Sequence, residues 1–121
     1  MYRIKKDINK NRLYISVSGI ISITEAKKIK EELEKEVDEL QPKFDLINDI
    51  SRFIHGQEEA GTILHEIMNS MIKKKVNRIV RVVGDSKEGL IQFANNSLPV
   101  DAYQLRYVPT LAEAEKLLDQ K

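Results

Sequence analysis

The segment from residue 44 to residue 85 constrains the fold of this chain more than any other. Residues 44–50 (FDLINDI) form an apolar run typical of a buried strand, and residues 51–57 are expected to interrupt it. Residues 58–75 carry apolar side chains at helical spacing, and residues 78–85 (RIVRVVGD) form a second apolar run that ends in a turn. A strand, a helix and a strand in this order are the crossover unit of parallel sheets. The segment therefore predicts an α/β fold.

Two shorter β-prone segments come before it. Residues 2–7 and 12–18 flank a polar connection at residues 8–11, an arrangement typical of a hairpin. In the second segment Leu13, Ile15 and Val17 alternate with less apolar residues, which predicts a strand with two unlike faces. We expect Gly19 to end that strand.

Sequence patterns that mark the start and the end of helices occur in the rest of the chain. Ser22-Ile23-Thr24-Glu25 is a capping-box pattern, and it opens a helix with an apolar stripe that we expect to stop at Gln41-Pro42. A second capping box at residues 109–113 follows a last strand at residues 105–108 and opens a final helix. A weaker helix is expected between these two regions. The apolar residues of the first helix are Ala26, Ile29, Leu33, Val37 and Leu40. Those of the weaker helix are Leu90, Ile91 and Ala94, and those of the final helix are Ala114, Leu117 and Leu118.

The predicted order of elements is ββαβαβαβα, in one domain that spans residues 1–121. We expect the strands at residues 13–18, 44–50, 79–83 and 105–108 to be parallel, with residues 2–7 antiparallel at one edge. Right-handed crossovers then place helices on both faces of the sheet.

Composition narrows the class of protein. A hydrophobic content of 41% with 32% charged residues suits a soluble globular domain. The formal net charge of +1 provides no basic field for nucleic acid or for an anionic membrane, and no apolar run is long enough to span a bilayer. The chain has no cysteine and its first residues are not those of a signal peptide, so we expect a cytoplasmic protein without stable membrane insertion.

The order of elements and several short segments resemble the STAS fold (sulphate transporter and anti-sigma factor antagonist), and within it the SpoIIAA-like group of small stand-alone proteins. The residues behind the resemblance are the strand ends at 17–20 and 49–51, the turn at 82–85, Arg106-Tyr107 and the terminal helix at 112–118. The resemblance implies a non-enzymatic binding or regulatory module that acts through a protein partner.

In anti-sigma factor antagonists a serine at the start of the second helix is phosphorylated by a partner kinase. The matching positions here are Glu58 or Glu59, or Ala60 after a shift of one residue, and none of these can accept a phosphate. A carboxylate at this place is either a permanent negative charge or an ordinary glutamate favoured by the helix dipole. The phosphorylation switch is therefore not expected to operate at this position.

Each remaining candidate residue has a purely structural interpretation and a functional one. His55 is expected in the loop after a parallel strand, where open α/β sheets place ligand groups, so a small enzyme using His55 as a general acid or base is the rival class. The turn with Asp85 and Ser86 has the geometry of an anion site but not the spacing of a phosphate-binding motif, and helix capping is the simpler interpretation. No cofactor or metal site is predicted.

The helix at residues 58–75 has the least ordinary pattern. Its apolar face is wide and includes Met68 and Met71, and methionine is common at surfaces that adapt to a partner. The helix is either central to the core or partly exposed. In the second case we expect self-association as a homodimer, or a lipid-like apolar ligand beneath the helix.

Overall fold

An antiparallel hairpin opens the chain in the computed structural model, which describes residues 1–56, 59–84 and 104–120. Strand β1 (Tyr2–Asp7) pairs with β2 (Arg12–Ile21) around a tight turn, in which Asn11 adopts a positive φ of 54°. Ile4 faces Ile15 across the pair, and both side chains belong to the same core cluster. The predicted hairpin and the edge position of β1 are confirmed.

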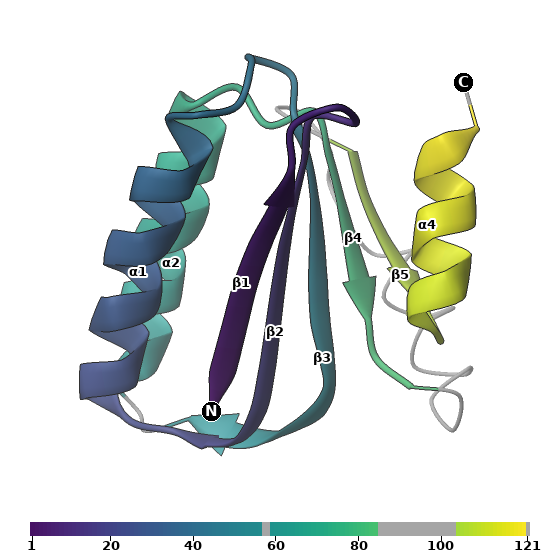
Figure 1. Cartoon of the computed structure of the whole chain (residues 1–121). Helices are drawn as coiled ribbons and strands as arrows, with labels where there is room; N and C mark the ends of the chain where they lie inside the picture. The colour runs from purple at the N-terminus through teal and green to yellow at the C-terminus, as the bar shows by residue number, and fades with distance from the viewer. Residues whose placement is uncertain (57–58, 85–103, 121) are drawn as a thin grey trace.

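Three further strands continue the sheet in chain order. Strands β3 (Asp45–Gly56), β4 (Arg78–Val82) and β5 (Gln104–Val108) follow β2, and each pair from β2 to β5 is parallel. Figure 1 shows the five strands fanning out between the helices. The predicted α/β class with one antiparallel edge strand is therefore correct. The helix predicted around Leu90, Ile91 and Ala94 lies outside the described residues.

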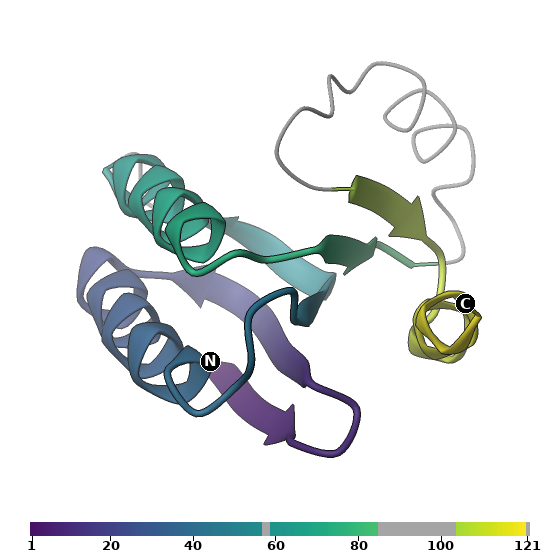
Figure 2. The same ribbon diagram turned by 90° about the horizontal axis from the view of Figure 1, so that it is seen from above.

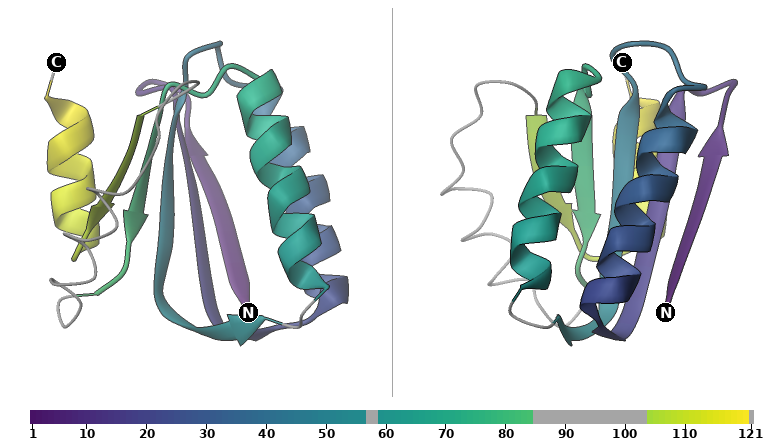
Figure 3. Two further views of the ribbon diagram at one scale, coloured as in Figure 1. Left: turned by 180° about the vertical axis from the view of Figure 1, so that it is seen from behind. Right: turned by 90° about the vertical axis from the view of Figure 1, so that its left-hand side faces the viewer.

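Helices lie on both faces of the sheet, as predicted. Helices α1 (Ile23–Val37) and α2 (Ala60–Lys73) connect successive parallel strands and pack side by side on one face. Helix α4 (Leu111–Asp119) packs on the other face, against β3, β4 and β5. Figure 2 shows this separation from above, and the right-hand view of Figure 3 shows α1 and α2 together in front of the strands.

The apolar residues form two core clusters, one on each side of the sheet. The larger cluster lies under α1 and α2 and includes Leu33, Phe44 and Met71, each at most 2% exposed. The smaller cluster lies under α4 and includes Ile47, Val80 and Ala114. Alternate residues of β3 and β4 supply the two clusters, because successive side chains of a strand point to opposite faces.

The structure corrects the prediction that residues 51–57 interrupt the third strand. Strand β3 continues to Gly56, because residues 52–56 pair with the second half of β2, which also runs past its predicted end at Gly19. The register shifts on either side of that glycine, whose φ is +71°. Glycine enters this left-handed region without the steric cost of a Cβ, so the strand passes through an irregularity instead of ending.

The helix ends differ from the predicted ends by a few residues. Helix α1 ends at Val37 rather than at Gln41-Pro42, because Glu39 and Leu40 donate their amides to carbonyls three residues back and tighten the last turn. Helix α2 spans Ala60–Lys73 instead of residues 58–75, and a positive φ of 70° at Lys75 prevents its continuation.

Both predicted N-caps are present. The Ser22 hydroxyl accepts a hydrogen bond from the Glu25 amide at 3.1 Å, and the Thr110 hydroxyl accepts one from the Glu113 amide at 3.2 Å. The Glu25 carboxylate forms an ion pair with the amino group of Met1, which fixes the start of β1 to the start of α1. In the part of the chain that the structure describes, no helix is long and apolar enough to cross a membrane.

Candidate functional site

Among the predicted interaction residues, the structure describes the side chains of Glu59, Met68 and Met71 and the backbone of His55. Glu58, Asp85 and Ser86 lie outside the described residues. Glu59 is the exposed N-cap of α2, in a helical conformation and without a side-chain capping bond. The position that resembles a phosphorylation switch is therefore open to solvent at Glu59.

His55 lies in a strand and not in a loop, which corrects the sequence prediction. Its backbone is part of β3 and is in register with Ile20 of β2. A catalytic His55 was expected only in the loop that follows a parallel strand, and a position within β3 does not have that geometry. Across residues 1–56, 59–84 and 104–120, no group of three histidine, cysteine or acidic side chains is arranged to hold a metal ion.

The two methionines of α2 have different environments. Met71 is 0% exposed and packs in the core under α1 and α2, so it cannot form part of an exposed docking surface. Met68 is half-buried, and its sulfur lies 3.9 Å from Nη2 of Arg81 on β4. The wide apolar face of α2 is therefore mainly a core face, and Met68 marks the place where that core is not closely filled.

A cavity of about 240 Å³ lies beneath α1 and α2, against the central strands of the sheet. Its walls come from the two helices and from β2, β3 and β4, and nearly all of them are apolar. Ala26 of α1 contributes only a methyl group, which leaves space where a longer side chain would fill the layer. The side chains around the cavity are Ile15, Val17, Ile21, Ala26, Ile29, Leu33, Leu46, Asn48, Ile50, Phe53, Ile67, Met68 and Arg81.

Two polar side chains interrupt this apolar lining on neighbouring strands. Asn48 of β3 and Arg81 of β4 are in register, so their side chains leave the same face of the sheet about 5 Å apart. Tyr107 of β5 is in register with Arg81 and accepts a hydrogen bond from its Nη1 at 2.8 Å. The Arg81 guanidinium also lies 5.6 Å from the centre of the Tyr107 ring, within the range of a cation–π interaction.

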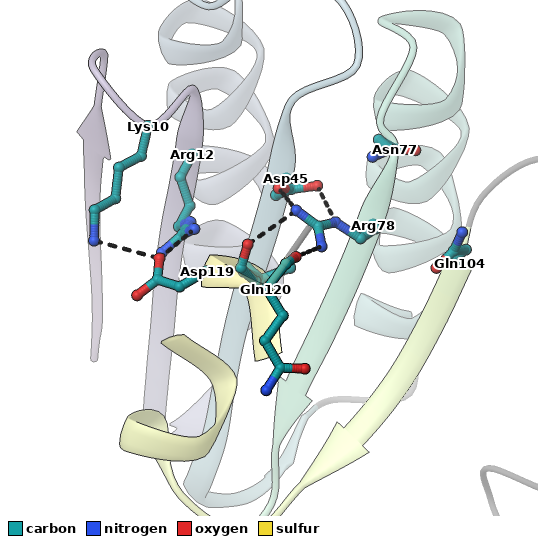
Figure 4. A pocket seen from close by; sticks show the side chains of 9 residues that line it. Lys10, Arg12, Asp45, Asn77, Arg78, Gln104, Asp119 and Gln120 are labelled. Atoms are coloured by element: carbon teal, nitrogen blue, oxygen red, sulfur yellow. Dashed lines mark hydrogen bonds and ion pairs between the residues drawn. The ribbon is translucent and has the colours of Figure 1, made fainter. Parts of the chain in front are cut away.

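A polar pocket of about 590 Å³ lies on the opposite face, at the amino ends of the parallel strands (Figure 4). Arg78 binds the buried Asp45 through both carboxylate oxygens, at 3.1 and 2.7 Å, and also donates to the carbonyls of Leu118 and Gln120. These bonds satisfy carbonyl groups at the C-terminal end of α4, which helix geometry leaves without partners.

Arg12 completes this anchor for α4. Its side chain is only 4% exposed, and it bonds Glu115 at 2.6 Å and Asp119 at 3.1 Å. The hydrogen bond from Arg12 lowers the pKa of Asp119 below its ordinary value of 3.8. Burial and the hydrogen bond to Glu115 raise the pKa of Tyr14, whose hydroxyl lies 2.8 Å from the same carboxylate. Because the charges are paired with one another, this pocket holds a helix in place, and the apolar cavity is the better candidate for a binding site.

Sequence reasoning did not select Asn48 and Arg81. Both interrupt apolar runs, at residues 44–50 and 79–83, that were interpreted only as buried strands. The available signal was their placement: a polar residue at an inward position of a buried strand requires a partner. That signal can be used only when it is known which face of each strand α1 and α2 cover.

No protein-family model matches the chain, and no curated protein matches it either. Solved structures nevertheless share its fold over nearly the whole length. An uncharacterized protein from the DUF3478 family with a SpoIIAA-like fold, from Shewanella loihica PV-4, has a TM-score of 0.72 at 15% identity and covers 98% of this chain and 92% of its own.

The anti-sigma factor antagonist SpoIIAA in its unphosphorylated form has a TM-score of 0.67 at 10% identity, with complete coverage of both chains. The Bacillus cell fate determinant SpoIIAA in the phosphorylated form has a TM-score of 0.63 at 9% identity, covering 98% of this chain and 99% of its own. The chain therefore has a STAS-type, SpoIIAA-like fold, as its sequence resemblance predicted.

Proposed function

We propose that this protein is a non-enzymatic binding module whose ligand is a small apolar molecule held between α1, α2 and the sheet. The observation that carries the proposal is the cavity of about 240 Å³ with an almost entirely apolar lining. Ligand sites in proteins are concave and mostly apolar, with a few polar groups that fix orientation. Asn48 and Arg81 are the polar groups in this lining.

The volume sets the size of the ligand. At roughly 30 Å³ for each group of the size of water or methylene, the cavity accommodates about eight such groups. Transfer of eight methylenes out of water contributes at most about 6 kcal/mol, which corresponds to a dissociation constant of tens of micromolar. The costs of association weaken this value, so a dissociation constant of tens of micromolar is the tightest binding that we expect.

A titration with 1-octanol, followed by NMR of the side-chain methyl groups, tests the proposal. We expect saturable shifts confined to methyl groups around the cavity, such as those of Ile15, Ile29 and Ile67. The variant Ala26→Leu fills part of the cavity and should weaken binding at least tenfold. Ala112→Leu places the same side chain on an exposed position of α4 and serves as the matched control. Shifts spread over the surface, or equal binding by Ala26→Leu, would contradict the proposal.

A second candidate function is regulation through a protein partner, including a second copy of this chain. The similarity of fold to an anti-sigma factor antagonist favours it, as does the exposed start of α2 at Glu59. We expect such a module to act in the cytoplasm and to carry no phosphate at this helix start. Solution mass measured for the wild type and for Ile72→Asp, an exposed position of α2, tests self-association. A monomer in both cases would remove the homodimer from consideration.

A further inference from the structure

Arg81 occupies an unusual position for an arginine. It lies on β4, an interior strand in the parallel part of the sheet, on the face covered by α2, and its side chain lines an apolar cavity. Its contacts in the described residues are the hydroxyl of Tyr107 and the sulfur of Met68, which are neutral groups. No carboxylate of the described residues lies within 4.0 Å of the Arg81 guanidinium. Arg12 and Arg78, on the other face of the sheet, both have carboxylate partners within that distance.

Asn48 lies beside Arg81 with unused hydrogen-bonding capacity. Its carboxamide is half-buried on the cavity wall and has no hydrogen-bond partner among the residues that the structure describes. The carboxamide nitrogen carries two donors. Since Asn48 and Arg81 are in register, a guanidinium and an amide donor meet on one side of the cavity.

This arrangement has an energetic consequence. Arg81 is half-buried, and a cation that is partly removed from water without an anionic partner carries a cost, whereas a charge-assisted hydrogen bond in a site of low dielectric is strong. A carboxylate presents two acceptor oxygens, and one can bind the guanidinium while the other binds the carboxamide. The aliphatic walls from β2 and α1, including Val17 and Ala26, then accommodate a hydrocarbon tail that extends away from β4.

From this geometry we propose that the ligand is a medium-chain carboxylate, with its head at Arg81 and Asn48 and a tail of about seven carbons beneath α1 and α2. The inference depends on the proposed function, because it specifies the chemical class of the ligand for the same cavity. The chain length follows from the cavity volume at roughly 30 Å³ for each group. The ion pair supplies orientation and selects the acid over neutral molecules of the same length.

The test compares octanoate with 1-octanol in NMR titrations at pH 7. Wild-type protein should bind octanoate at least tenfold more tightly than 1-octanol, and the side-chain Nε resonance of Arg81 should shift only with octanoate. Arg81→Gln should lose at least tenfold in octanoate binding, and its affinity for 1-octanol should fall by a much smaller factor. Arg106→Gln, an exposed arginine on the adjacent strand, is the matched control and should leave both affinities unchanged.

The outcomes separate this inference from the function on which it depends. If 1-octanol binds in the cavity and octanoate binds no better, the carboxylate head is refuted and the apolar site remains. If Arg81→Gln weakens both ligands equally, the arginine only maintains the cavity and the inference is again refuted. If neither compound binds the wild type, the proposed function itself fails. Should Arg81→Gln not fold, the wild-type comparison of octanoate with its neutral methyl ester decides the same question.

Discussion

Filling the cavity from α1 should stabilise the protein, although the substitution enlarges a completely buried residue. Ala26 is 0% exposed and lines the cavity of about 240 Å³. Leucine at this position adds three carbon atoms, which need about 90 Å³ at roughly 30 Å³ each. The cavity has room for them, so the side chain gains burial without displacing its neighbours.

The expected magnitude follows from two opposing contributions. Burial of three further carbons contributes about 2.4 kcal/mol at roughly 0.8 kcal/mol each. Loss of rotamer freedom by the leucine costs about 0.5–1 kcal/mol. The free energy of unfolding of Ala26→Leu should therefore rise by about 1.5 kcal/mol, which corresponds to an increase in Tm of about 6 °C for a domain of this size.

Ala114 of α4 provides the opposite case for comparison. It is also 0% exposed and also faces the sheet from a helix, but it belongs to the other core cluster and does not line the cavity. Leucine there overpacks the contact between α4 and the sheet and should cost about 1–3 kcal/mol. Urea unfolding monitored by circular dichroism measures both variants. Equal destabilisation of Ala26→Leu and Ala114→Leu would refute the reasoning, because it would mean that the layer beneath α1 has no free volume.

Two further predictions concern the charged anchor of α4. Arg78→Met leaves the buried Asp45 without its bidentate partner and should lower the free energy of unfolding by about 2–3 kcal/mol in urea titrations, whereas Arg106→Met on the exposed surface should change it little. Asp119 has a lowered pKa in the folded state, so its stabilising effect is present above its ordinary pKa and is lost as the pH falls through the lower folded value. Asp119→Asn should therefore have a lower Tm than the wild type at pH 7, and the difference should shrink as the pH falls below 3.8; a difference that is constant with pH would contradict this.

The architecture could be predicted because apolar periodicity and chain order act together. The alternation of Leu13, Ile15 and Val17 defined a strand with two faces, and the caps at Ser22 and Thr110 defined where two helices begin. Short connections and right-handed crossovers then leave few arrangements for a chain of this order. The sheet order and the helices on both faces follow from these local signals.

The extension of β3 could not be predicted in the same way. Residues 52–56 have no strong alternation of their own, and they form a strand because β2 continues beside them through the irregularity at Gly19. A glycine signals both the end of a strand and a bulge within it, and only the partner strand distinguishes the two. The placement of His55 in a strand instead of a loop depends on the same pairing.

The cavity was equally inaccessible to pattern reasoning, because its walls come from two helices and three strands that are distant from one another in the sequence. The width of the apolar face of α2 was visible, and the alternative of an apolar ligand beneath that helix was drawn from it. The position of α2 against β4 determines that Met71 is buried in the core and that Met68 lies beside Arg81. Apolar periodicity identifies the covered face but not how completely it is filled.

The energetic cost of this cavity bears directly on its function. At about 24 cal/mol for each Å³ of closed cavity, a volume of about 240 Å³ sets an upper bound of about 6 kcal/mol relative to a filled core. Single domains are stable by only about 5–15 kcal/mol, so the cost is comparable with the whole net stability. Leucine in place of Ala26 would recover part of it by a single substitution, and apolar residues in place of Asn48 and Arg81 would close the lining further. A chain that retains small and polar residues at these positions gives up stability where a ligand can restore it, which is the usual relation between stability and a binding site.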